Sequence, residues 1–127
     1  MNKNITTFLM FEGQAEEAMN FYTSVFPDSA INHVLHHENG TVLHATFTIK
    51  GQIFMCVDSD IKHAFTFTPA ISLFVTCDTA EEVDGLFETL SESGQVLMPL
   101  SPIPVSEKFG WVQDKFGVSW QLNLAKN

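Results

Sequence analysis

Hydrophobic residues recur along the chain at two spacings, one typical of helices and the other of strands. Residues 15–26 carry apolar side chains three and four positions apart, which predicts a helix that ends at Pro27. Residues 80–91 repeat this spacing, with Asp78 or Thr79 as the N-cap and Gly94 as the stop signal. We therefore expect two helices, one in each half of the chain.

Shorter segments of β-branched and aromatic residues lie around the two helices. In the first half they are residues 5–11, 30–37, 41–49 and 52–58, and in the second half residues 70–77, 95–100, 108–113 and 118–124. Asn39-Gly40 is a hairpin signal, residues 101–104 read as a loop, and the polar residues 59–69 read as a linker. Each half therefore has the predicted order β-α-β-β-β.

The two halves also match residue by residue. Ala15-Glu16-Glu17 recurs 65 positions later as Ala80-Glu81-Glu82. The same offset aligns Thr7 with Ser72, and Cys56 with Gln121. We expect one domain over residues 1–127, built from a module at about 1–60 and a second at about 68–127.

This order predicts an α+β fold in which two tandem βαβββ modules form a curved mixed sheet. Helices would cover one face of the sheet, and the other face would line a concave cleft. Strand alternation assigns residues to the two faces. On the concave face it places His44, Phe54, Cys56, Asp58, Ser72, Phe74 and Gln121, and under the helices Ile53, Met55, Val57 and Trp120. The alternative is that the polar face meets bulk solvent, as in many antiparallel sheets.

Composition narrows the class of protein. The 127 residues have a net charge of −9, with six Lys+Arg against 15 Asp+Glu, which argues against binding to nucleic acid or an anionic membrane. A hydrophobic content of 45% excludes disorder, and twelve Phe require a thick core or an apolar cleft. Two cysteines, no apolar run near the ~20 residues of a membrane span and no secretory leader in residues 1–5 predict a cytoplasmic protein without disulfides.

Several segments together resemble a known superfamily. They are residues 8–11, 13–18, 20–22, 25–27, 44–45, 51–55, 67–72 and 111–121, the last reading Trp-Val-Gln-Asp-Lys-Phe-Gly-Val-Ser-Trp-Gln. With the duplicated β-α-β-β-β order, they resemble the vicinal-oxygen-chelate superfamily of glyoxalase I, extradiol dioxygenases and bleomycin- and fosfomycin-resistance proteins. The PhnB-like branch, known as 3-demethylubiquinone-9 3-methyltransferase domains, is the most similar. The resemblance implies a glyoxalase-like fold and a small-molecule ligand.

The resemblance also implies a metal site at four positions on the concave face. In this chain those positions are Thr7, Cys56, Ser72 and Gln121. Two hydroxyls, a thiol and an amide are a poor set for a divalent ion, so we expect no metal cofactor. No G-x-G-x-x-G turn accompanies the methyltransferase name, so we do not expect that activity either.

The candidate catalytic residues are His44 and Asp58. An imidazole in the cleft could act as a general base that the carboxylate orients. The alternative is a strand histidine and an unrelated turn aspartate. Cys56 is a nucleophile only if its pKa is lowered, and a buried inert thiol is the favoured interpretation.

The candidate ligand-binding residues are Thr7, Phe54, Cys56, Ser72, Phe74, Trp111 and Gln121. Phe54, Phe74 and Trp111, together with Phe67, could form an aromatic wall for a flat ligand, or could belong to the core. His33, His36 and His37 have a metal-like spacing, but a solvated strand is favoured and their role is open. His63 is expected to be exposed.

Two functions fit these features. The first is a homodimeric small-molecule-binding protein with no assigned substrate. As a lyase, isomerase or dioxygenase it would use His44 for proton transfer and Gln121, Ser72 and Thr7 to orient a polar ligand. The alternative is a non-catalytic module that sequesters its ligand, as resistance proteins do. Whether His44 and Asp58 lie within hydrogen-bond reach discriminates between the two. A third interpretation, a purely structural dimer, predicts a cleft filled by the protein's own Phe side chains.

Overall fold

The computed structural model describes residues 4–126. The chain divides between His63 and Ala64 into two compact units, inside the segment 59–69 that the sequence indicates as a linker. We call residues 4–63 module one and residues 64–126 module two. The ends of the predicted single domain, residues 1–3 and 127, lie outside the described residues, as does most of the segment considered for a leader.

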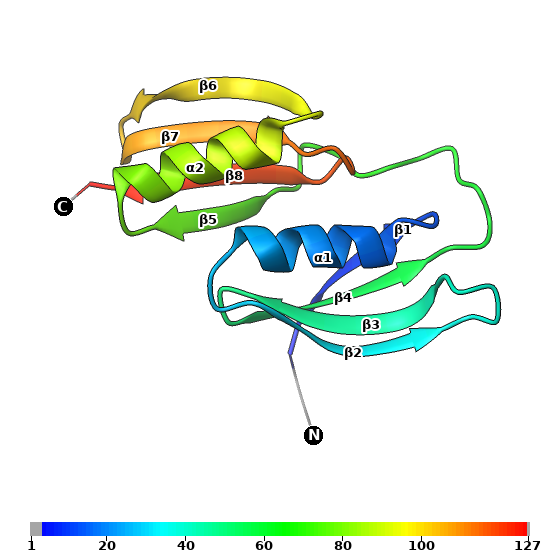
Figure 1. Cartoon of the computed structure of the whole chain (residues 1–127). Coiled ribbons are helices and arrows are strands. Elements are labelled where there is room, and N and C mark those ends of the chain that lie inside the picture. Colours follow the sequence, from blue (N-terminus) through cyan, green and yellow to red (C-terminus); the bar gives the residue numbers. More distant parts are fainter. Residues whose placement is uncertain (1–3, 127) are drawn as a thin grey trace. The chain divides into compact units, whose positions relative to one another are not determined.

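Module one has the predicted order of elements (Figure 1). They are β1 (Thr7–Phe11), α1 (Ala15–Val25), β2 (Ala30–His36), β3 (Val42–Ile49) and β4 (Gln52–Asp58). The strands form a sheet of order β1-β4-β3-β2, in which β1 and β4 are parallel and the other pairs antiparallel. The hairpin at Asn39-Gly40 is confirmed, since Gly40 has a φ of 90° and its N–H donates to the His37 carbonyl.

Module two repeats this plan. Its elements are β5 (Leu73–Cys77), α2 (Ala80–Ser91), β6 (Gln95–Ile103), β7 (Ser106–Gln113) and β8 (Ser119–Ala125). The sheet order is β5-β8-β7-β6, again with one parallel pair. Two βαβββ modules and an α+β class are therefore confirmed, as two four-stranded mixed sheets, while the cleft stays a prediction.

One predicted loop is a strand. β6 continues through residues 101–104 as far as Ile103, where the sequence predicts a turn. Pro99 and Pro102 have no N–H to donate to a neighbour, which usually ends a strand. Because β6 is the edge of its sheet and its register with β7 shifts at three places, both prolines are tolerated there.

The two helices begin differently. Thr79 is the N-cap of α2, where its Oγ1 accepts from the Glu82 N–H at 3.1 Å. The N-cap of α1 is Gln14, whose side chain makes no capping bond. In its place the Asp58 carboxylate accepts from the N–H groups of Gly13 and Ala15 at 2.8 and 2.9 Å. The end of β4 therefore holds the start of α1.

Each helix packs on one face of its own sheet. The buried side of α1 is Ala15, Ala18, Met19 and Tyr22, and that of α2 is Val83, Leu86 and Leu90. Opposite them lie Leu9, Ala45 and Phe47 in module one and Val112, Trp120 and Leu122 in module two, all nearly inaccessible to solvent. Neither helix in residues 4–126 has the length and apolar character to span a membrane.

The predicted faces of β4 are reversed in the structure. Phe54, Cys56 and Asp58 are 6%, 0% and 3% exposed on the side that faces α1, not on the open side. The pairing of the strands explains this, because Ala45 lies opposite Cys56 and cross-strand partners share a face. Met55 and Val57 therefore lie on the open side.

A one-residue difference between the modules accounts for part of this error. Three residues separate β1 from α1, but only two separate β5 from α2. The helices are thus related by 65 positions, whereas the parallel strand pairs Thr7–Phe54 and Leu73–Trp120 are related by 66. Thr7 therefore corresponds to Leu73 and not to Ser72. By the same shift Gln121 corresponds to Met55 and not to Cys56.

Candidate functional site

Four of the predicted ligand-binding residues lie together on the face of module two that α2 does not cover. The orientation follows from Gly110, where an added Cβ would meet Phe87 of α2, so that its neighbour Trp111 points to the other side. We define the module-two face as Ser72, Phe74, Phe109, Trp111, Ser119 and Gln121. Ser72, Phe74, Trp111 and Gln121 were predicted from the sequence.

The strand register arranges these residues in rows across the sheet. Gln121 on β8 has Phe74 opposite it on β5 and Trp111 opposite it on β7. Adjacent strands lie about 4.8 Å apart, so an amide group is flanked on both sides by aromatic rings. The Phe74 side chain is 57% exposed, and Trp111 and Gln121 are half-buried.

Hydrogen bonds join the polar side chains of this face into one network. The Trp111 Nε1–H donates to Ser119 Oγ at 2.8 Å, and the two hydroxyl oxygens of Ser72 and Ser119 are 2.9 Å apart. Gln121 Nε2 donates to Ser72 Oγ at 3.1 Å, and each serine lies 3.3 Å from the Pro69 carbonyl. The network fixes the indole and the amide in defined orientations.

Sequence reasoning missed Ser119 and Phe109 as members of the site. Ser119 accepts the indole hydrogen and links Trp111 to Ser72. Phe109 is buried, with its ring centroid 6.5 Å from that of Phe74. Both share the strand phase of a predicted residue, Ser119 with Gln121 and Phe109 with Trp111, so alternation could have identified them.

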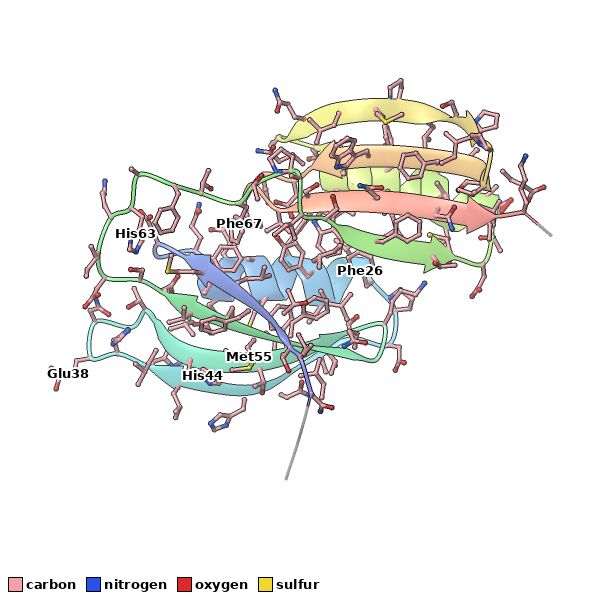
Figure 2. All side chains as sticks on the ribbon, turned by 180° about the vertical axis from the view of Figure 1, so that it is seen from behind. Phe26, Glu38, His44, Met55, His63 and Phe67 are labelled. Atoms are coloured by element: carbon pink, nitrogen blue, oxygen red, sulfur yellow. The ribbon has the colours of Figure 1, made fainter. Side chains whose placement is uncertain are left out.

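The open face of module one holds His44, as predicted. The His44 ring is half-buried and lies 6.4 Å from the Phe8 ring. This pair occupies the place of the Phe74–Phe109 pair in module two, since Phe8 corresponds to Phe74 and His44 to Phe109. Met55 lies on the same face (Figure 2).

His44 and Asp58 do not form the predicted pair. Asp58 shares its face with Cys56 under α1, while His44 lies on the opposite face of the sheet. The Asp58 carboxylate also accepts from the Val42 N–H at 2.9 Å, in addition to those of Gly13 and Ala15. Asp58 is therefore a structural acceptor that joins α1, β3 and β4.

Three further predicted residues lie on the helix side of module one. Phe54 stacks on Phe47, with ring centroids 5.5 Å apart. Thr7 is opposite Phe54 in the register and shares its face, although it is exposed at the start of β1. Cys56 is fully buried. The register, which groups these residues with the core, is the reason that they do not belong to the open face.

The environment of Cys56 makes it unreactive. Burial, reinforced by the negative charge of Asp58, raises the pKa of its thiol from 9.0 to about 12. Because the thiol of an unfolded chain ionises at lower pH, this shift contributes stability to the folded state that is fully present below about pH 9. That stability is lost as the pH rises from about 9 towards 12.

We expect neither cysteine to react with Ellman's reagent at pH 8 in the folded protein. Cys56 and Cys77 are both buried and form no disulfide within the described residues, and the Cys56 thiolate is scarcely populated at that pH. Addition of urea should release two thiols per chain, measured at 412 nm. Rapid reaction of one thiol without denaturant would show that Cys56 is accessible and activated.

The metal site that the superfamily implies does not fit the residues present. Thr7 and Cys56 face α1, and Ser72 and Gln121 already hydrogen-bond to each other. Residues 4–126 contain no group of three or more His, Cys, Asp or Glu side chains placed to hold a metal ion.

The remaining histidines have separate local contacts. His36 Nε2 lies 2.8 Å from Glu16 Oε1, which links β2 to α1 at an exposed position. His63 is half-buried, not exposed as expected, and its Nε2 lies 3.0 Å from Ser59 Oγ. His33 is exposed opposite Thr46. The structure does not bring His33, His36 and His37 into one cluster.

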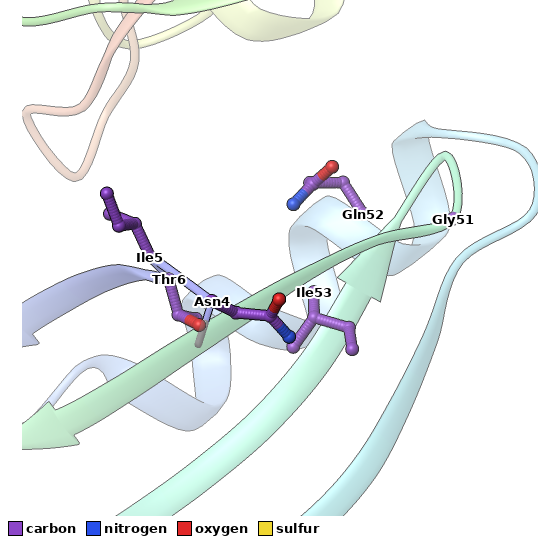
Figure 3. Close-up of a pocket in the computed structure, with 6 residues that line it drawn as sticks. All are labelled: Asn4, Ile5, Thr6, Gly51, Gln52 and Ile53. Atoms are coloured by element: carbon purple, nitrogen blue, oxygen red, sulfur yellow. The ribbon is translucent and has the colours of Figure 1, made fainter. Parts of the chain in front are cut away.

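Module one also has a shallow pocket of about 260 Å³ beside the β3–β4 turn (Figure 3). Its lining consists of Asn4, Ile5, Thr6, Gly51, Gln52 and Ile53. None of these lining residues, all from the described part of the chain, is ionisable or belongs to the predicted site. We therefore take the module-two face as the candidate site.

Comparison with known proteins places the chain in a family. The family model for 3-demethylubiquinone-9 3-methyltransferase matches residues 3–123. The chain belongs to this family. The solved structure of a PhnB protein from Bacillus cereus is 59% identical to it, covers 97% of this chain and 100% of its own, and has a TM-score of 0.93. The PhnB-like resemblance drawn from the sequence is confirmed.

More distant relatives extend the comparison. A glyoxylase/bleomycin resistance protein/dioxygenase domain from Frankia sp. EAN1pec is 13% identical, covers 100% of this chain and 95% of its own, and has a TM-score of 0.72. That likeness shows the glyoxalase-like fold alone. YjdN from Escherichia coli is 29% identical over 101 residues, or 80% of this chain. The chain spans about 60% of the length of YjdN.

The family's name is not evidence of methyl transfer by this chain. Only Glu12-Gly13-Gln14 separates β1 from α1, and Asp78-Thr79 separates β5 from α2. Neither connection is the glycine-rich turn that a nucleoside cofactor would need at a helix start. The fold is shown, and the substrate is not defined by it.

Proposed function

We propose that the protein binds a small organic molecule on the module-two face and holds it without a catalytic histidine–aspartate pair. The observation that carries this proposal is the hydrogen-bonded network of Trp111, Ser119, Ser72 and Gln121 beside the exposed ring of Phe74. Binding sites for small molecules combine apolar walls with a few fixed polar groups, and this face has both.

Rigidity supports a binding role. The indole hydrogen of Trp111 is held by Ser119, so the ring is fixed before any ligand arrives. The amide of Gln121 is held in the same way by Ser72. A ligand would therefore bind without first ordering these side chains, which favours affinity.

The lack of an ionisable group on this face favours binding over catalysis. None of the six side chains of the module-two face titrates near neutral pH, so none can act as a general acid or base there. The resistance-type module, which sequesters its ligand, is the interpretation that these residues support best.

The second candidate is an enzyme with His44 as the proton-transfer group. It is favoured by the position of His44, half-buried on the open face of module one beside Phe8. The reaction class would be that of a lyase, isomerase or dioxygenase. If a reaction is found, replacement of His44 by Gln should abolish it, and unchanged turnover in His44→Gln would rule out this role.

We further propose that the protein is a homodimer of the cytoplasm. Exposed apolar side chains on the edge strands, Leu35 of β2 at 47% and Val96 of β6 at 49%, are surfaces that a second copy can cover. Neither cysteine forms a disulfide within the described residues, as is usual in a reducing compartment. Light scattering coupled to size exclusion tests the dimer, and a mass of 14.2 kDa would contradict it.

The binding proposal predicts different effects of variants at equivalent positions in the two modules. Gln121→Ala should weaken the binding of benzamide, used as a simple aromatic probe, about tenfold, because one hydrogen bond of roughly 1.4 kcal/mol is lost. Trp111→Ala should weaken it at least as much. Met55→Ala, at the position of module one that corresponds to Gln121, should leave it unchanged.

Isothermal titration calorimetry measures these affinities, and circular dichroism checks that each variant is folded. An equal loss in Met55→Ala and Gln121→Ala would contradict the assignment of the site to module two.

A further inference from the structure

Positive charges are few in this protein. The sequence contains no arginine, and its lysines are Lys3, Lys50, Lys62, Lys108, Lys115 and Lys126. Lys108 on β7 bonds to Asp84 of α2 at 2.8 Å, and Lys115 in the β7–β8 turn lies over the Phe116 ring. Of the described lysines, none is a member of the module-two face.

This distribution disfavours an anionic ligand. Phosphate, phosphonate and carboxylate groups are usually bound by Arg or Lys, and transfer of an unpaired anion from water to a half-buried site is unfavourable. The net charge of −9 adds long-range repulsion. The ligand of this face is therefore neutral or cationic.

The hydrogen-bond network determines which groups remain for the ligand. The indole hydrogen of Trp111 goes to Ser119, and the two serine hydroxyls connect to each other and to the Pro69 carbonyl. One amide hydrogen of Gln121 goes to Ser72, its hydrogen-bond partner within residues 4–126. The carbonyl oxygen and the second amide hydrogen of Gln121 are then the groups that the site presents.

A donor next to an acceptor is best matched by a ligand with an acceptor next to a donor. A carboxamide or lactam offers this combination, whereas a carboxylate offers two acceptors and an amidinium two donors. The rings of Phe74 and Trp111 on either side of Gln121 suit a flat ring attached to that group.

We infer that the ligand is an uncharged planar molecule with a carboxamide or lactam edge, which Gln121 recognises between Phe74 and Trp111. This inference rests on the proposed binding function and specifies its ligand class. It assigns Gln121 as the residue that determines specificity for charge and hydrogen-bonding pattern.

The test compares benzamide, benzoate and benzamidine, three probes with the same ring and different edges, by calorimetry on the full chain. The wild type should bind benzamide at least tenfold more tightly than benzoate. Gln121→Glu should lose about tenfold in affinity for benzamide and gain affinity for benzamidine, because the side chain then offers only acceptors.

Two variants separate recognition from general effects. Met55→Glu adds the same charge at the corresponding position of module one and should leave the benzamide-to-benzoate ratio unchanged. Gln121→Met introduces methionine, the residue at the corresponding position 55 of module one, without a change in charge. It should weaken benzamide binding about tenfold. It keeps the test valid if Gln121→Glu does not fold.

The outcomes distinguish the ligand class from the site. If benzoate binds as tightly as benzamide and Trp111→Ala abolishes both, the ligand class is wrong and the site stands. If Gln121→Met leaves benzamide binding unchanged, the assignment of Gln121 is overturned. If no probe binds, or none depends on Trp111, the proposed function fails together with this inference.

Discussion

Replacement of Asp58 by alanine is expected to lower the free energy of unfolding by about 4 kcal/mol. The carboxylate is 3% exposed and accepts from the N–H groups of Gly13, Ala15 and Val42. A buried donor left without an acceptor costs about 1–3 kcal/mol, and this variant would leave three donors unpaired. Because the hydrogen bonds of Asp58 join α1 to β3 and β4, the loss of these bonds should destabilise all of module one.

Urea denaturation followed by circular dichroism measures this effect. Asp60→Ala, two positions along at an exposed site, is the matched control and should change stability little. Asp58→Asn, which keeps one acceptor oxygen, should fall between the two. A loss of less than about 1 kcal/mol in Asp58→Ala would mean that these hydrogen bonds do not hold the module together.

Asp114→Ala should be comparably destabilising in module two, again by about 4 kcal/mol. Its Oδ1 accepts from the N–H groups of Phe116 and Val118, and its Oδ2 accepts from Trp120 Nε1 at 2.8 Å. The loss of this carboxylate removes the acceptor of three buried hydrogen bonds at the turn that connects β7 to β8. These strands carry Trp111 and Gln121, so benzamide binding should be lost as well.

Tryptophan fluorescence during urea denaturation reports this variant, because Trp120 is 1% exposed in the folded protein. Asp84→Ala is the control, since Asp84 forms only an exposed pair with Lys108 and such pairs contribute about 0–1 kcal/mol. If Asp114→Ala and Asp84→Ala were equally stable, the turn would not depend on the buried carboxylate. Wild-type benzamide affinity in Asp114→Ala would separate the binding face from the turn.

Both aspartates show the limit of residue chemistry as a guide to function. From sequence, Asp58 is a plausible partner for His44, because a carboxylate near a histidine is the usual pattern of acid–base catalysis. The structure gives it a role at the start of α1, where Gln14 provides no cap. Three backbone donors contributed by distant segments were not visible in the pattern of the strand itself.

The face of a strand is predictable from the sequence where one face of that strand is polar and the other apolar. In β8 polar Ser119 and Gln121 alternate with apolar Trp120 and Leu122, so the open face was assigned correctly. In β4 both faces contain large apolar residues, Phe54 on one face and Met55 on the other. Only the pairing with β3 decides between them, and the pairing is a tertiary property.

The prediction of the internal repeat was correct for the helices but one residue out for the strands. The helices fixed an offset of 65, and the order of elements follows from it. A single extra residue between β1 and α1 changes the offset of the strands to 66 and so moves Thr7 to the other face. Because a slip of one residue reverses the face of a strand, small loop differences have large consequences for a predicted site.

The most direct test of the account is nuclear magnetic resonance of the two indole N–H groups. The chain has two tryptophans, Trp111 on the module-two face and Trp120 under α2, and Trp111→Phe assigns their signals. On addition of benzamide the Trp111 signal should shift in a saturable manner while the Trp120 signal stays in place. A Trp111 signal that does not move in excess benzamide, or a shift confined to Trp120, would contradict the proposed site.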